Sequence, residues 1–150
     1  MKDVLASLSL VVAILTVYAG LALVYWGETL PLECRRFTGT APPEPTLTVT
    51  HSGRNWTVEL AERWGERFPK SQMFLRMRDP YGVDRFGMMR FTDLTMANWA
   101  TFHVVFQDIH PGIPGTCDGD RLLIDRTSYG LGSAFAVSFG NVLIATGFLH

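Results

Sequence analysis

The N-terminal part of the chain contains its most constraining feature, a long run without a charged side chain. The run extends over 23 residues, from Val4 to Trp26. At about 1.5 Å of rise per residue, a helix of that length crosses a hydrocarbon layer of about 30 Å. Tyr25 and Trp26 are typical of a membrane interface. We therefore expect one long hydrophobic α-helix over residues 1–27.

Three interpretations of this run compete. A cleaved secretory signal would use Gly20-Leu21-Ala22 as its small-x-small site. The run is longer than the 7–15 residues of a signal core and continues past that site, which argues against cleavage. A permanent single-span anchor remains open. So does a segment that enters the membrane first and later packs against copies of itself in a filament.

Small and hydroxylic side chains in the run favour the filament interpretation, because they allow helices to approach closely. The expected partners are then other copies of this chain, forming a helical homopolymer, and the membrane before assembly. The candidate assembly residues are Ala6, Ser9, Ala13, Thr16 and Gly20.

Residues 28–45 are expected to form a Pro/Gly-rich linker, because Pro42, Pro43 and Pro45 favour extended geometry. From residue 46 to 150, apolar residues alternate with polar ones in short segments bounded by Gly, Pro, Asp or Asn. This spacing predicts an antiparallel β-sandwich of about seven to eight strands. The segments are centred on 47–49, 56–60, 73–77, 88–91, 102–106, 122–124, 135–139 and 142–149.

Composition excludes several functions. The net charge is −1 and no Lys/Arg-rich run is present, so nucleic acid is not an expected partner. The nucleophile motif G-x-S-x-G is absent, and no paired carboxylates are singled out. We expect no enzymatic activity and no cofactor.

Three features indicate that the 46–150 domain lies outside the cytoplasm: its β-rich pattern, its two cysteines and a glycosylation sequon. Cys34 and Cys117 are 83 positions apart and can form a disulfide in an oxidising compartment. In the chain-entropy model such a bond stabilises the fold by roughly 4 kcal/mol. Two free thiols are the alternative. The sequon Asn55-Trp56-Thr57 makes Asn55 a glycosylation candidate.

An acidic segment between the expected fifth and sixth strands is the one candidate for a metal site. Asp108, Asp118 and Asp120 flank a glycine turn, as carboxylates do in calcium loops. Calcium needs six to eight oxygens, however, and no glutamate closes this loop. The favoured interpretation is therefore a turn whose aspartates accept backbone N–H groups.

Surplus aromatic residues provide a hint of binding. Phe74, Trp64, Trp99 and Phe148 exceed what one small core obviously needs. Exposed aromatic residues are enriched at protein–protein contacts. A sandwich core built of large side chains is an equal alternative.

The C-terminal half resembles archaeal type IV pilin-like proteins. The similarity rests on short motifs: Phe106-Gln-Asp108, Gly119-Asp120, Phe135-x-Val137 and Val142-Leu-Ile144. It implies an immunoglobulin-like β-sandwich on a hydrophobic helix, assembled into a cell-surface filament or retained as an accessory of one.

The expected function is thus a structural subunit of a cell-surface filament, extracellular after assembly and inserted in the membrane before it. The start Met1-Lys-Asp-Val4 offers no prepilin-peptidase site, and Leu5 stands where bacterial pilins have glutamate. A membrane-anchored β-sandwich that binds a filament or surface-layer partner therefore remains the alternative.

Overall fold

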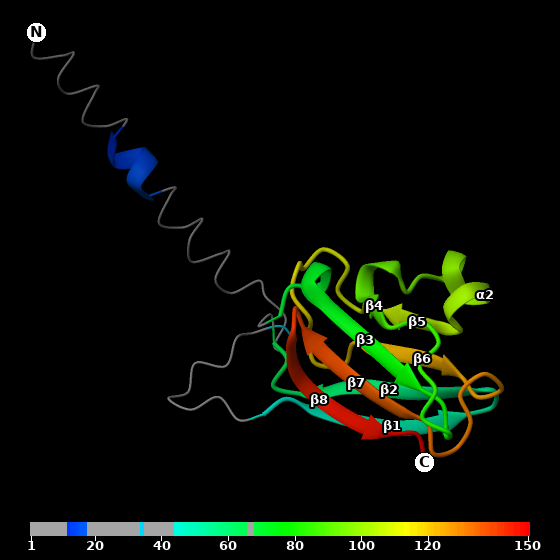
Figure 1. Ribbon diagram of the computed structural model, residues 1–150. Helices are drawn as coiled ribbons and strands as arrows, with labels where there is room; N and C mark the ends of the chain where they lie inside the picture. Colours follow the sequence, from blue (N-terminus) through cyan, green and yellow to red (C-terminus); the bar gives the residue numbers. More distant parts are fainter. Residues whose placement is uncertain (1–11, 18–33, 35–43, 66–67) are drawn as a thin grey trace, which may run out of the picture. The chain divides into compact units, whose positions relative to one another are not determined.

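The computed structural model describes residues 12–17, 34, 44–65 and 68–150. The chain divides into two units, Met1–Pro31 and Leu32–His150. Figure 1 shows the ribbon of both, with residues outside the described ranges drawn in grey.

The prediction of one long N-terminal helix is wrong. In the described part of the first unit, helix is confined to residues 12–17. No helix among the described residues is long and apolar enough to cross a membrane. The physical reason is that an apolar run determines the environment a segment needs, not its conformation. Most helical stability comes from packing, whereas Val12, Ile14 and Leu15 are more than half exposed here.

The second unit is a β-sandwich of two antiparallel four-stranded sheets, as predicted (Figure 1). The first sheet has the order β1 (Thr46–Ser52), β2 (Asn55–Glu62), β6 (Arg121–Asp125), β5 (Val104–Gln107). The second has the order β4 (Met88–Arg90), β3 (Met73–Arg78), β7 (Ala134–Phe139), β8 (Val142–Phe148). The short helices are η2 (Lys70–Gln72), η3 (Phe91–Asp93), η4 (Met96–Asn98) and α2 (Trp99–Phe102).

The period-two pattern of the sequence places the core between the sheets. Successive side chains of a strand point to opposite faces, so every second residue is buried. The register joins the inward residues across strands: Leu75 faces Val137 and Met77 faces Phe135. The inward residues of β2, β3, β6 and β7 are Trp56, Val58, Leu60, Met73, Leu75, Met77, Leu122, Ile124, Phe135 and Val137.

The chain differs from the predicted strands before β5. Phe102 was expected in a strand but ends α2, and His103 follows it with a φ of 57°. This left-handed residue ends the helix, because its N–H donates to the carbonyl of Trp99. His103 is therefore at a corner, 3.7 Å from the carboxylate of Asp125, rather than within a strand.

A glycine fixes how closely β8 lies over the core. Gly147 is opposite Phe135 in the register. A Cβ added at Gly147 would lie 2.5 Å from Cζ of the Phe135 ring. No larger residue fits there without moving that ring, so Gly147 allows the close approach of strand and core.

Candidate functional site: a buried charge cluster and an exposed sheet face

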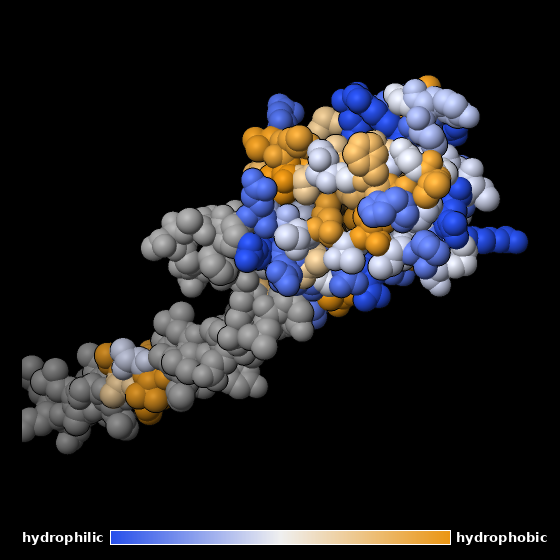
Figure 2. Space-filling model, turned by 90° about the horizontal axis from the view of Figure 1, so that it is seen from below, coloured by the Kyte–Doolittle hydropathy of each residue, from blue (hydrophilic) through white to orange (hydrophobic). Residues whose placement is uncertain are grey.

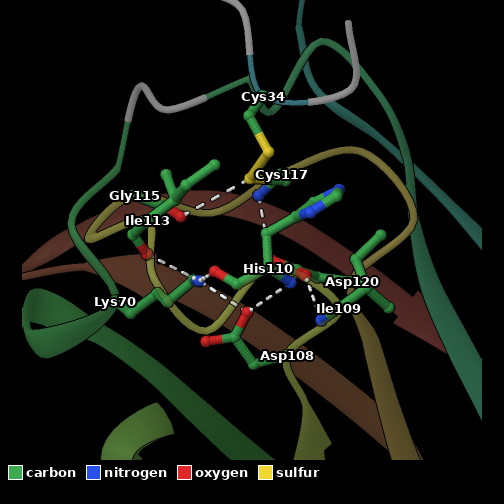
Figure 3. Close-up of polar contacts among 9 residues, drawn as sticks. All are labelled: Cys34, Lys70, Asp108, Ile109, His110, Ile113, Gly115, Cys117 and Asp120. Atoms are coloured by element: carbon green, nitrogen blue, oxygen red, sulfur yellow. Dashed lines mark hydrogen bonds and ion pairs between the residues drawn. A yellow bond between two sulfur atoms is a disulfide. The ribbon is translucent and has the colours of Figure 1, made fainter. Parts of the chain in front are cut away.

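Lys70 is at the centre of a buried polar cluster below the disulfide (Figure 3). It is the only lysine after Lys2 and is 7% exposed. Its ammonium group donates to Asp108 Oδ1 at 2.6 Å, to the carbonyl of Ile113 at 2.8 Å and to that of His110 at 3.0 Å. All three hydrogens of the ammonium thus have an acceptor, which is the condition under which a buried charge is tolerated.

Asp120 holds two segments of the same loop together. It is fully buried, and its two oxygens accept the backbone N–H of Ile109 at 3.0 Å and of Cys117 at 2.8 Å. Burial raises the pKa of Asp120, against the lowering effect of these two hydrogen bonds and of Lys70. Asp120 therefore fixes the loop that contains Cys117.

Asp118 points to a different segment. Its carboxylate accepts the N–H groups of Trp64 at 2.7 Å, Arg63 at 3.1 Å and Gly65 at 3.3 Å. These residues follow the end of β2, where Arg63 takes a φ of 71°. Asp118 thereby orders the chain after β2 and helps to place Trp64, which is fully buried.

Cys34 and Cys117 form the predicted disulfide, and both are fully buried. The bond joins residue 34 to the loop between β5 and β6, next to the Lys70 cluster (Figure 3). It closes a loop with a sequence separation of 83. Disulfide, ammonium and carboxylates thus stabilise one junction of the sandwich.

The three aspartates of the metal hypothesis are divided between these roles. Lys70 supplies the positive charge beside Asp108 and Asp120, while Asp118 binds backbone N–H groups elsewhere. Within the described ranges, no group of three or more His, Cys, Asp or Glu residues could hold a metal ion. The cluster holds the loop in place, because Lys70 and the three aspartates all bond to groups of the chain itself.

The outer face of the second sheet is exposed and largely apolar, in contrast to the buried polar cluster around Lys70. Small residues of β7, Ala134 and Ala136, form the floor of a hollow of about 310 Å³. Leu143 and Phe148 of β8 line one side and are 61% and 63% exposed. Figure 2 views the domain from the side on which β1 and β8 lie in Figure 1, and hydrophobic residues gather there between hydrophilic ones.

Arginines of β3 line the other side of this hollow. Arg78 is exposed, and Arg76 is paired with Asp84. The hydrogen bond from Arg76 is the main reason that the pKa of Asp84 lies below its ordinary value. On neighbouring β4, Arg90 lies over the Phe74 ring at 5.6 Å. The face therefore combines apolar side chains on one side with guanidinium groups on the other.

The remaining candidate residues fall in different places. Ala6, Ser9 and Gly20 lie outside the described residues. Ala13 and Thr16 are exposed in the helical segment, where the Thr16 hydroxyl donates to the carbonyls of Val12 and Ala13.

The four surplus aromatic residues and Asn55 are divided between core and surface. Trp64 belongs to the core, and Phe74 is half-buried under Arg90. Phe148 is exposed on β8, and Trp99 is half-buried beside Asn55 at the rim of a second hollow.

Two functional groups were not anticipated from the sequence. Lys70 could have been suspected, because a lone lysine in a domain otherwise rich in arginine is unusual. The β8 face had a visible signal, since the run from Val142 to Leu149 is apolar on both faces. A strand of that composition at a sheet edge exposes whatever side chains point away from the core.

Comparison with known proteins adds no identity. Neither a protein-family model nor a curated protein nor a solved structure matches this chain significantly.

Proposed function

We propose that this chain is a structural subunit of a cell-surface assembly, in which the β-sandwich lies outside the cytoplasm and associates with a second copy through β8. The observation that supports this most is the apolar outer face of β8, which has no partner strand on its far side among the described residues. Leu143 and Phe148 on this face are each more than 60% exposed. Exposed apolar residues grouped on one edge are typical of contact surfaces.

The four sheet edges differ in their suitability for pairing. β4 and β5 have three and four residues, and short edge strands pair poorly with another chain. β1 and β8 both have seven residues and no charged side chain. β1 exposes threonines, whereas β8 exposes large apolar residues. β8 thus lacks the charges and prolines with which proteins usually protect an edge.

The shape of the β8 face favours a second copy over an unrelated partner. The same face contains protruding side chains, Leu143 and Phe148, and a hollow floored by Ala134 and Ala136. In a two-fold antiparallel β8–β8 pairing, the outward side chains of both copies lie side by side on one face, so Leu143 and Phe148 of the two copies would form one continuous apolar surface. In a β8–β8 pairing, the two β3 strands would lie five strand spacings apart, about 24 Å. Their arginines would then be separated by more than a Debye length.

An extracytoplasmic location is supported by the disulfide and by the apolar N-terminal run. Disulfides persist in oxidising compartments and are rare in the cytosol, and Cys34–Cys117 is a fully buried bond. The uncharged run from Val4 to Trp26 requires an apolar environment, which lipid before assembly or other copies after it would supply.

The strand order supports an immunoglobulin-like sandwich. Lettered along the chain, β1-β2-β6-β5 is A-B-E-D and β4-β3-β7-β8 is C′-C-F-G. The immunoglobulin fold has the sheets A-B-E-D and C-F-G, to which variable-type domains add C′. The resemblance to archaeal pilin-like proteins suggests a filament as the form of the assembly.

Sedimentation velocity of the full chain in detergent micelles tests this proposal. The oxidised chain should associate as its concentration rises. The double variant Leu143→Arg, Phe148→Arg should dissociate at least tenfold more readily, because four guanidinium groups would then meet in one interface. The matched control is Thr48→Arg, Thr50→Arg, which adds the same charge to exposed positions of β1. It should associate like the wild type.

Equal association of both double variants would contradict a β8 interface. A chain that stays monomeric until a different surface protein is added would contradict self-association. Folding of each variant is checked beforehand by its thermal unfolding midpoint.

A further inference from the structure

A second hollow opens at the end of the first sheet, beside α2. Its volume is about 600 Å³, and it is lined by Arg54, Asn55, Trp99, Asp125 and Thr127. The β1–β2 turn, the end of β6 and the start of α2 contribute these residues, and they lie at the same end of the domain in Figure 1. This hollow shares no lining residue with the β8 face.

The wall formed after β6 is held rigidly. Asp125 accepts hydrogen bonds from the Thr127 hydroxyl at 2.7 Å, the Ser128 hydroxyl at 3.0 Å and the Thr127 N–H at 3.1 Å. Burial raises the pKa of Asp125, but these hydrogen bonds together outweigh it and hold the pKa below its ordinary value. Arg126 lies over the Trp56 ring at 4.7 Å and donates to the carbonyl of Gly53 at 3.0 Å.

Three polar side chains of the same hollow have no hydrogen-bond partner within the part of the chain that the structure describes. There, the Arg54 guanidinium, the Asn55 amide and the Trp99 indole N–H make no hydrogen bond. The other two tryptophans of the domain do: Trp56 Nε1 donates to the carbonyl of Tyr129, and Trp64 Nε1 to that of Thr46. The donors at this hollow are thus available to a ligand, on a scaffold that is already fixed.

We propose that this hollow binds a pyranose sugar, with the ring stacked on Trp99 and its hydroxyl groups bonded to Asn55, Arg54 and Asp125. A sugar ring has an apolar C–H face that suits an aromatic side chain and a rim of donors and acceptors that suits amide, guanidinium and carboxylate groups. Arg54 and Asp125 have opposite charges, which favours a neutral ligand over a phosphate. A concave site with one aromatic residue and a few converging polar groups is the usual form of a small-ligand site.

Two sources can supply the same sugar chemistry. Asn55 begins the sequon Asn55-Trp56-Thr57, so a glycan attached to its amide nitrogen would place its first ring next to Trp99. A glycan of another surface molecule would enter the same hollow without a covalent bond.

The indole signals in ¹H–¹⁵N NMR spectra of the full chain in detergent distinguish these sources. The unglycosylated chain is titrated separately with N-acetylglucosamine, mannose and galactose to 50 mM. At least one sugar should move the Trp99 indole signal saturably, with a dissociation constant on the order of millimolar, the range of about −4 kcal/mol. The Trp56 and Trp64 indole signals, bonded inside the core, serve as references and should not move.

Trp99→Ala should abolish saturable binding as detected by the ligand's own NMR signals. Tyr81→Ala is the control, because Tyr81 is an aromatic residue that is 92% exposed elsewhere on the domain.

Mass spectrometry of the chain from the cells that make it shows whether Asn55 bears a glycan. If it does, Asn55→Gln should change the Trp99 indole signal. A glycan that leaves this signal unchanged, or an unmodified chain that binds none of the three sugars, would overturn the proposal.

Discussion

The loop junction under the disulfide and the outer face of β8 differ in how their side chains are placed: those of the junction are bonded within the chain, and those of β8 are exposed. At the junction, the Lys70 ammonium has three acceptors, and both Asp120 oxygens accept backbone N–H groups. On the β8 face, Leu143 and Phe148 are more than 60% exposed beside a hollow. Polar groups that are hydrogen-bonded within the chain stabilise its fold. Apolar side chains that remain exposed to solvent are available for contact with another molecule.

Because of this difference, effects on folding stability and effects on association can be measured separately. Substitutions at the junction should lower the free energy of unfolding without weakening association of the remaining folded chain. Substitutions of outward side chains on β8 should weaken association without unfolding the domain.

Loss of the disulfide should have the largest effect. The double variant Cys34→Ser, Cys117→Ser frees a loop with a sequence separation of 83. We expect the free energy of unfolding to fall by about 4 kcal/mol in the chain-entropy model. Urea unfolding followed by tryptophan fluorescence measures it. A midpoint equal to that of the oxidised wild type would show that the bond does not constrain the unfolded chain.

Lys70→Met should have the next largest effect. The substitution keeps most of the aliphatic length but removes the charge, so Asp108 and two carbonyls lose their donor. Breaking a buried ion pair on one side costs about 3 kcal/mol. Arg121→Met is the control, because its exposed pair with Glu59 should contribute less than ~1 kcal/mol. Similar losses for both variants would refute the structural role of Lys70.

Gly147→Ala tests the comparison within β8 itself. The added methyl group would meet the Phe135 ring, so we expect a loss of about 2 kcal/mol from overpacking. Thr146→Ala, at the neighbouring exposed position, should cost much less. Differential scanning calorimetry measures both midpoints. A Gly147→Ala variant as stable as the wild type would mean that Phe135 moves aside without cost.

The strands were predictable because alternation of apolar and polar residues is a local property. The inward residues of β3, Met73, Leu75 and Met77, follow directly from their spacing. The partner in the disulfide was also predictable, since only one pairing of Cys34 and Cys117 exists. That the two thiols lie close enough to bond is a property of the fold, and the structure decides it against two free thiols.

The long helix and the Lys70 cluster were missed for a different reason. The apolar run from Val4 to Trp26 predicted one long helix, whereas the helix among its described residues covers 12–17. The Lys70 cluster depends on acceptors 38 to 43 positions away, two of them backbone carbonyls. Such contacts arise from the register of loops, which no residue pattern encodes. Asp118 and Asp120, two positions apart in the acidic segment, bind different parts of the chain for the same reason.

Hydrogen–deuterium exchange of the oxidised full chain, at low and high concentration, tests the central claim most directly. Within the ranges that the structure describes, the backbone N–H groups on the outer edge of β8 have no partner strand. If two copies pair through β8, amides from Val142 to Phe148 should exchange more slowly at high concentration, while those of β1 should not change. Unchanged exchange in β8, or slower exchange in β1 alone, would contradict the proposed assembly through this edge.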